Sequence, residues 1–279
     1  MRVYISVDME GIAGVSHPRP TGRDDSEYPR NVALMVGEAN AAIAGAFDGG
    51  ADAVVVNDSH GDMHNLPPAD LDPRASLVQG SKPYSMVEAA ADGRFDLALF
   101  VGYHARAGHP TGTIAHTYTG KPTLTLLGGR PVPEAGMNAL YLGALAIPVG
   151  LVAGDDALAA EMADWLPWAE AVVVKRGIST FAAESVHPTE ACARIRAASE
   201  RAVRRITGPA GDAAPLRPLR LDPPIEVGID FHRPIQAAWA ATIPGAWRDG
   251  DRGVRYRAAD PVEAFRAFVS LMRLGSSIG

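Results

Sequence analysis

Short apolar runs rich in β-branched residues alternate with longer stretches of helical periodicity up to about residue 205. The short runs predict strands at residues 3–7, 53–56, 97–101, 148–153 and 171–175. The longer stretches predict helices at residues 84–91, 137–146 and 155–166, and an earlier helix that Ser26 caps and that ends at Gly49-Gly50. This alternation is typical of a mostly parallel sheet with helices on both faces, so we expect an α/β fold.

The pattern changes near residue 206, where glycine and proline become frequent. Residues 208–224 predict an irregular crossing. Beyond it, residues 225–231 and 253–257 have the pattern of strands, and Asp260-Pro261-Val262-Glu263 predicts a helix that Asp260 caps. We interpret residues 1–205 as an α/β domain and residues 206–279 as a smaller C-terminal α+β domain.

Composition and charge narrow the class of protein. The chain has 279 residues, of which 47% are hydrophobic, and this is enough for a sizeable buried core. Its formal net charge is -6, and because a phosphate-binding surface needs a basic excess, we expect no nucleic-acid partner. Cys192 is the only cysteine, which excludes an intrachain disulfide and a cysteine-rich zinc site.

No apolar run reaches the about 18 residues of a membrane helix and no signal-peptide layout is present, so we expect a cytoplasmic location and no membrane partner.

Polar residues collect directly after the predicted strands. Asp8 and Glu10 follow the first strand, Asn57-Asp58-Ser59-His60 follows the second, and Gly102-Tyr103-His104 follows the third. Gly154-Asp155-Asp156 follows the fourth. Ligands of open α/β sheets bind at the carboxyl ends of the strands. If these strands are parallel, their carboxylates and imidazoles therefore form one site.

Carboxylate and imidazole groups are the ligands that zinc and neighbouring transition metals prefer. A strand has a period of two, so Asp8 and Glu10 can point the same way, where their charges repel each other unless a cation lies between them. Taken alone, these two acids are more often a cap and a solvated surface residue. His60 and His104 at equivalent strand ends favour the metal site. His116 lies among small residues, where a ligand can approach.

Seven segments are long enough to compare with known families. They read SVDMEGIAG at 6–14, VNDSHGDMHNL at 56–66, KPYSMVE at 82–88, FVGYHARAG at 100–108, AHT at 115–117, PEAGMNA at 133–139 and VAGDD at 152–156. In their order and near-constant spacing, these segments resemble the DppA-like D-aminopeptidase family, a group of binuclear zinc exopeptidases. The chain length and the smaller C-terminal domain are also similar to that family.

The resemblance implies two zinc ions per chain, held by Asp8, Glu10, His60, His104 and Glu134. Asp8 matches the residue that bridges the two ions. Glu10 and His60 match the remaining ligands of the first ion, and His104 and Glu134 match those of the second. Glu134 is implied by the resemblance alone, because its position favours an ordinary acid at a helix start.

The resemblance also implies an aminopeptidase that acts on short peptides or amino-acid amides, above all on peptides of D-amino acids. Two zinc ions that share a water lower its pKa, and the resulting metal-bridged hydroxide attacks the peptide carbonyl. His116 matches the catalytic histidine of the family, and His109 is the competitor in the same loop. The histidine can act as a base, as an acid or as a donor to the developing oxyanion.

Several alternatives stay open. An L-specific aminopeptidase or an amidase has the same motifs, because motifs do not report the chirality of a pocket. A small-molecule-binding α/β protein without chemistry is the second alternative, although a binding site has little need of so many metal-type ligands. Asp155 or Asp156 can bind the substrate's amino group, but Asp155 fits better as the cap of the following helix. Resemblance to the family further implies a homo-oligomer, namely a decamer.

Overall fold

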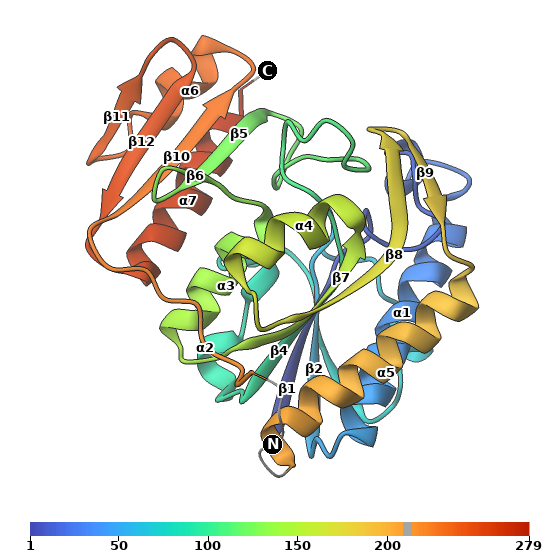
Figure 1. Cartoon of the computed structure of the whole chain (residues 1–279). Coiled ribbons are helices and arrows are strands. Elements are labelled where there is room, and N and C mark those ends of the chain that lie inside the picture. The colour runs from blue at the N-terminus through green and yellow to red at the C-terminus, as the bar shows by residue number, and fades with distance from the viewer. Residues whose placement is uncertain (209–213, 279) are drawn as a thin grey trace.

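The chain folds around two β-sheets, seen in a computed structural model that describes residues 1–208 and 214–278 (Figure 1). The larger sheet has the strand order β3 (Ala75–Val78), β2 (Ala53–Asp58), β1 (Arg2–Val7), β4 (Leu97–Tyr103), β7 (Val149–Asp155), β8 (Glu170–Ser179) and β9 (Ala182–Ser185). All its neighbours are parallel except β8 and β9. The α/β fold with a mostly parallel sheet is confirmed.

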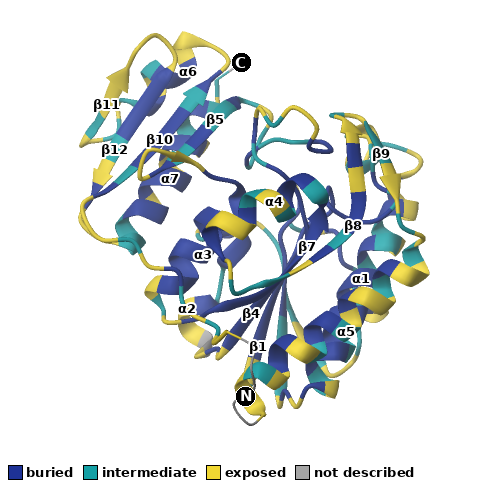
Figure 2. Ribbon diagram, viewed as in Figure 1, coloured by how far each residue is buried: buried dark blue, intermediate teal, exposed yellow. Residues whose placement is uncertain are grey.

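Helices cover both faces of the larger sheet. One face carries α1 (Tyr28–Asp48) and α5 (Pro188–Thr207), which pack against each other (Figure 1). The other face carries α3 (Glu134–Ala144) and α4 (Asp156–Trp165), with the short α2 (Ala90–Gly93) beside them. The strands between these layers are buried almost throughout, whereas the outer sides of α1 and α5 are exposed (Figure 2).

The alternation of side chains along β1 divides the apolar residues between two cores. Val3 and Ile5 join the core under α1 and α5, together with Ile43 and Ile195. Tyr4, between them in sequence, belongs to the core on the opposite face. Because successive side chains of a strand point to opposite faces, a strand that is apolar at every position is buried on both sides.

The second sheet is antiparallel and lies beside the first (Figure 1). Its order is β11 (Ala246–Asp249), β12 (Gly253–Ala258), β10 (Ile225–Phe231), β5 (Pro122–Leu127) and β6 (Arg130–Pro131). The helices α6 (Pro234–Ala240) and α7 (Pro261–Ser276) pack on it, and Phe231 and Phe265 share one apolar core with Tyr4. Two strands of this sheet thus come from residues 122–131, and the domain division at residue 206 stays a prediction.

Two local predictions are wrong. Residues 84–91 do not form one helix, because Ser85 and Ala89 have positive φ angles of 53° and 63°, and the segment splits into a 3-10 turn at Ser85–Val87 and the start of α2. Ser26 does not cap α1, which follows Glu27 without a side-chain cap. By contrast, the Asp260 side chain accepts a hydrogen bond from the Glu263 amide and caps α7, as predicted.

The structure describes part of the irregular crossing that the sequence predicts at residues 208–224. Residues 209–213 of the predicted irregular crossing lie outside the described residues, and residues 214–224 contain no helix or strand.

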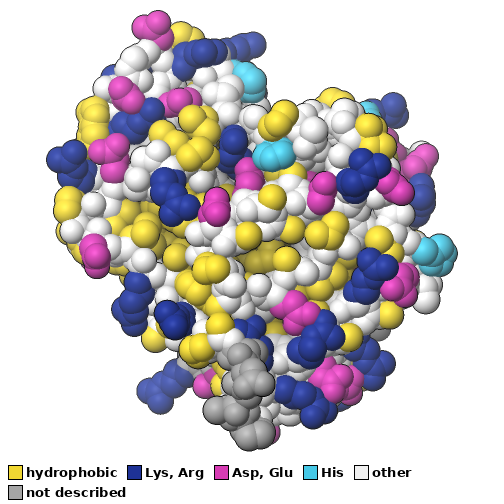
Figure 3. All heavy atoms as spheres, in the orientation of Figure 1, with side chains coloured by type: hydrophobic (Ala, Val, Ile, Leu, Met, Phe, Trp, Pro, Cys, Tyr) yellow, Lys and Arg dark blue, Asp and Glu magenta, His cyan; other side chains and the backbone are white. Residues whose placement is uncertain are grey.

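Acidic and basic side chains are interspersed over the face seen in Figure 3. Among the described residues, no helix is both long enough and apolar enough to cross a membrane.

Candidate metal centre

The parallel strands β1, β2 and β4 end at the same edge of the larger sheet. In register, Val7 pairs with Asp58 of β2 on one side and with Val101 of β4 on the other. The residues that follow these strand ends are therefore brought together, as the sequence predicted: Asp8, Glu10, His60 and His104.

Two glycines let the segment after β1 lie directly against the end of β4. A Cβ on Gly11 would lie 1.8 Å from the Tyr103 carbonyl oxygen, and a Cβ on Gly102 would lie 2.1 Å from the Asp8 carbonyl oxygen. Gly102 also has a φ of +71°, a conformation that favours glycine. A side chain at either position would push the backbone of Asp8 and Glu10 away from β4.

The first half of the cluster consists of Asp8, Glu10 and His60, and we call it the His60 half. His60 Nδ1 lies 2.8 Å from Glu10 Oε2 and 3.4 Å from Asp8 Oδ1. Its other nitrogen, Nε2, lies 3.0 Å from the Thr21 carbonyl oxygen. All three side chains are buried, so the imidazole and the carboxylates satisfy one another within a short distance.

The second half consists of His104, His116 and Glu134, and we call it the His104 half. His104 Nε2 lies 3.5 Å from Asp8 Oδ2 and 3.6 Å from Glu134 Oε1, which is too far for a good hydrogen bond. Among the described residues this buried nitrogen has no hydrogen-bond partner. Nδ1 lies 3.0 Å from the Ala105 carbonyl oxygen and donates to it, so Nε2 carries the free lone pair.

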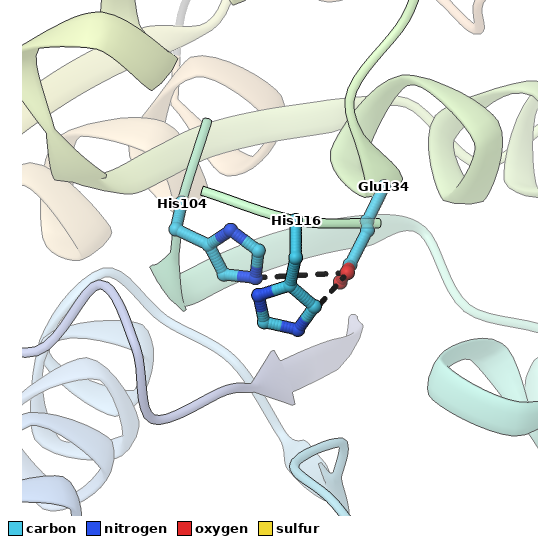
Figure 4. Close-up of side chains that lie close together, drawn as sticks. All are labelled: His104, His116 and Glu134. Atoms are coloured by element: carbon cyan, nitrogen blue, oxygen red, sulfur yellow. Dashed lines mark ion pairs between the residues drawn. The ribbon is translucent and has the colours of Figure 1, made fainter. Parts of the chain in front are cut away.

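His116 reaches the same place from the loop between β4 and β5. Its ring stacks on that of His104 with the centroids 4.3 Å apart, and Figure 4 shows both rings beside Glu134. His116 Nδ1 donates to the Ile114 carbonyl oxygen at 2.8 Å, which leaves Nε2 facing Glu134 Oε1 at 3.9 Å and Glu10 Oε1 at 4.0 Å. His116 Nε2 is therefore placed to hold or release a proton beside the cluster.

Burial shifts the pKa values of three side chains of the cluster. It raises the pKa of Asp8 well above its usual range, with the charge of Glu10 acting in the same direction. It also raises the pKa of Glu134 to about 7 and lowers the pKa of His104 to about 3. Three carboxylates share one buried place, and such a group is stable in its charged form only with positive charge nearby.

A buried scaffold holds the segment that follows β1. Lys175 of β8 is 1% exposed, and its Nζ donates to the carbonyl oxygens of Glu10, Ile12 and Val15. Glu38 of α1 accepts a hydrogen bond from the amide of the same segment, at Ala13. These contacts hold the backbone between Glu10 and Val15 in place and thereby help to position the His60 half.

A cavity of about 330 Å³ opens beside the cluster. Its wall contains His60, His116 and Glu134 of the cluster, and also Lys82 and Arg273. A volume of this size is at the lower end of those that hold small ligands. The cavity is thus suited to a small molecule that reaches the cluster.

Comparison with known proteins agrees with this geometry. A peptidase family profile described as D-aminopeptidase matches residues 1–270. This chain belongs to the D-aminopeptidase family. A D-aminopeptidase of Bacillus subtilis (strain 168) is 37% identical over 276 residues, which are 98% of this chain and 97% of the relative.

A solved D-aminopeptidase structure shares the fold. It is described as Zn-dependent D-aminopeptidase DppA from Bacillus subtilis, a self-compartmentalizing protease. The two chains superimpose with a TM-score of 0.92 at 35% identity, covering 99% of this chain and 98% of the other. The resemblance to the D-aminopeptidase family found in the sequence is thereby confirmed.

The donors of this D-aminopeptidase family member fit zinc. Asp8, Glu10 and His104 offer ligand atoms within 4.8 Å of one another, and so do His104, His116 and Glu134. The free lone pair of His104 Nε2 is buried and unsatisfied among the described residues, which is the state of an imidazole prepared for a metal. Carboxylates and imidazoles without thiolates are a donor set that zinc accepts.

Other residues considered in the sequence lie outside the cluster. Asp155 caps α4 by accepting from the Leu158 amide at 2.8 Å, so its prediction as a helix cap is confirmed. His109, the competitor of His116, instead accepts a hydrogen bond from the Gly112 amide at 2.9 Å through Nδ1. The geometry therefore brings His116 rather than His109 to the cluster.

The sequence did not single out Lys82 and Arg273 of the cavity wall. Lys82 stands at the start of KPYSMVE, one of the segments that carried the family resemblance, and this was its only signal. Arg273 lies on α7 and gave none, because its place depends on how α7 packs.

Proposed function

We propose that this protein is a zinc-dependent aminopeptidase that hydrolyses short peptides or amino-acid amides from the amino terminus, with D-amino-acid peptides as its substrates. The observation that carries the proposal is the convergence of three carboxylates and three imidazoles in one cluster, in which the buried His104 Nε2 has no hydrogen-bond partner among the described residues. Family membership supports both the hydrolysis and the D-specificity.

We infer that each chain holds two zinc ions, one in each half of the cluster. Glu10 and His60 would hold the first ion, and His104 and Glu134 would hold the second. Asp8 lies between His60 and His104, 3.4 Å from the first through one oxygen and 3.5 Å from the second through the other, so both ions would share it. When bound, the zinc ions supply Lewis acidity toward the peptide carbonyl and lower the pKa of a water molecule.

His116 is the group of this chain that handles the proton. Because Nδ1 is occupied by the Ile114 carbonyl oxygen, Nε2 is the atom that accepts a proton from the attacking water and returns it to the leaving amine. The stacked ring of His104 fixes the plane of His116. Asp8, Glu10 and Glu134 are buried, and their limited contact with bulk water strengthens the electrostatic interactions at the reacting atoms.

A substrate screen separates the proposed function from its alternatives. We would incubate the zinc-supplemented protein with D-alanine and L-leucine p-nitroanilides, with the matching amides and with D- and L-dipeptides. Turnover of the D-series above the L-series supports the proposal. A preference for the L-series would replace it with an L-aminopeptidase, and turnover of amides alone would replace it with an amidase. Tight ligand binding without metal or turnover would indicate a non-catalytic binding protein.

We further propose a cytoplasmic homodecamer. The description of the solved relative as self-compartmentalizing supports an assembly in which the sites are enclosed. Light scattering after size-exclusion chromatography tests the number of subunits, and a monomeric mass would contradict it. Cell fractionation tests the location.

A further inference from the structure

Lys82 is a buried cation in the wall of the cavity. It is 5% exposed, and its Nζ donates to Asn57 Oδ1 at 2.8 Å and to the Asp58 carbonyl oxygen at 2.6 Å. An ammonium group has three N–H donors, so one donor remains beyond these two neutral acceptors. Within residues 1–208 and 214–278, Lys82 forms no ion pair with a carboxylate. A buried charge without a counter-ion is costly, which favours an anion at this place.

Arg273 brings a second positive charge to the same wall from α7. Its Nη2 donates to the Lys82 carbonyl oxygen at 2.7 Å, and this contact places the guanidinium beside the Lys82 segment. A guanidinium has five N–H donors, and within the described part of the chain this is its one hydrogen bond. The other N–H groups of the guanidinium are available to a ligand, and their planar arrangement matches the two oxygens of a carboxylate.

The acids of the cavity do not neutralise these two cations. Asp8, Glu10 and Glu134 each lie within 3.6 Å of an imidazole nitrogen of the cluster, and none of them pairs with Lys82 or Arg273. Asp62, a further acid of the cavity wall, pairs with Arg23 at 3.0 Å. The two cations thus line the same cavity as the acidic cluster, and among the described residues neither forms an ion pair with a carboxylate.

We propose that Lys82 and Arg273 form a binding site for the free α-carboxylate of the substrate. The inference rests on the proposed function, since it places the scissile peptide bond at the cluster and the carboxyl end at the two cations. A cavity of about 330 Å³ suits a peptide of two or three residues, whose two ends are close enough to be held in one cavity. The substrate class is therefore short peptides with a free carboxyl end, in preference to amides.

The test compares two substrates that differ only in the carboxyl group: D-alanyl-D-alanine and D-alanyl-D-alaninamide. Each presents the same peptide bond to the zinc-loaded enzyme. We expect kcat/KM of the parent to be about 10- to 100-fold higher for the dipeptide, the range given by hydrogen bonds to charged groups. Arg273→Met removes most of this preference by raising KM for the dipeptide, with kcat for both substrates close to that of the parent.

Two further variants of α7 sharpen the result. Arg273→Lys retains part of the preference, because it keeps the charge but loses the planar fork. Arg266→Met is the matched control: it removes an exposed arginine two turns earlier on the same helix, outside the cavity wall, and leaves the preference unchanged.

Lys82→Met tests the buried cation through the ratio of the two kcat/KM values. Lys82 also supports Asn57 and Asp58 near His60, but any loss of zinc lowers both rates alike and cancels in the ratio. We expect the ratio to fall toward one. Equal kcat/KM for both substrates in the parent, or an unchanged ratio in Arg273→Met, would overturn this inference while the aminopeptidase function stands. Absence of turnover with every peptide and p-nitroanilide would instead overturn the proposed function.

Discussion

The two halves of the cluster satisfy their charges in different ways. In the His60 half, an imidazole nitrogen lies 2.8 Å from a carboxylate oxygen, so opposite charges neutralise each other directly. In the His104 half, the imidazole nitrogens of His104 and His116 lie 3.6 and 3.9 Å from the Glu134 carboxylate, and His104 Nε2 has no hydrogen-bond partner among the described residues. The comparison teaches that a metal would have to replace existing ion pairs in the His60 half, whereas it would supply a missing partner in the His104 half.

The protonation of the two histidines follows the same division. The charges of Glu10 and Asp8 outweigh burial and raise the pKa of His60 well above its usual range. Burial lowers the pKa of His104 to about 3, so its ring is neutral at neutral pH. Since metal ligands must be deprotonated, a metal would have to displace a proton from His60 but not from His104.

The largest effect is expected where the two halves meet. Asp8 lies between His60 and His104, at 3.4 and 3.5 Å, so Asp8→Ala removes a ligand from both ions. We expect the zinc content to fall from two equivalents to near zero and peptide turnover to fall to background. Elemental analysis and a kinetic assay on the same preparation check this. A variant that keeps one full equivalent would show that Asp8 serves only one half.

The next largest effect separates proton transfer from metal binding. His116→Ala removes the imidazole that faces Glu10 and Glu134 at 4.0 and 3.9 Å but leaves the shorter contacts in place. We expect zinc content like that of the parent and a fall in kcat of about 100- to 10,000-fold, the usual contribution of a general acid–base group. His109→Ala is the matched control from the same loop and should leave kcat unchanged. Near-parent turnover in His116→Ala would contradict the role.

A paired experiment compares the halves directly. Glu10→Ala removes a carboxylate of the His60 half, and Glu134→Ala removes one of the His104 half. We expect each variant to bind one zinc as the parent does and the other at least about 10-fold more weakly, since even supporting groups of a metal site contribute that much. Titration of the metal-free proteins with zinc measures both affinities. Loss of both ions in either variant would mean that the halves do not bind separately.

The smallest expected effect concerns Glu38, which supports the segment after β1 that carries part of the His60 half. This effect depends on pH. Glu38 Oε1 accepts from the Ala13 amide at 2.8 Å, and burial raises the pKa of Glu38 from 4.5 to about 7. Between these values the folded chain keeps the proton and the unfolded chain loses it, so the free energy of unfolding falls as pH rises through this window. The loss amounts to about 3 kcal/mol at most.

Glu38→Gln removes this titration. We therefore expect the variant to gain stability over the metal-free parent as pH rises from 5 to 8, as measured by urea unfolding. Glu27→Gln, an exposed glutamate at the start of the same helix, is the control and should show no such trend. A parallel pH dependence of parent and Glu38→Gln would contradict the buried proton.

The strand-end residues of the cluster were predictable from the sequence for a physical reason. Parallel strands end at one edge, so Asp8, Glu10, His60 and His104 meet once the strands are recognised. His116 comes from the loop between β4 and β5 and Glu134 from the start of α3, and no periodicity fixes the path of the chain that leads to them. The residues themselves indicated only that a ligand can approach His116, and the family resemblance alone pointed to Glu134. Arg273 depends on the packing of α7 against a core that both sheets share, which a local pattern does not contain.

The zinc content of the parent, measured together with its activity, tests the central claim most directly. Elemental analysis should find two zinc equivalents per chain. Hydrolysis of D-alanyl-D-alanine should disappear when a chelator removes the metal and return when zinc is added back. A metal-free preparation that still hydrolyses the peptide at the parent rate would contradict the account.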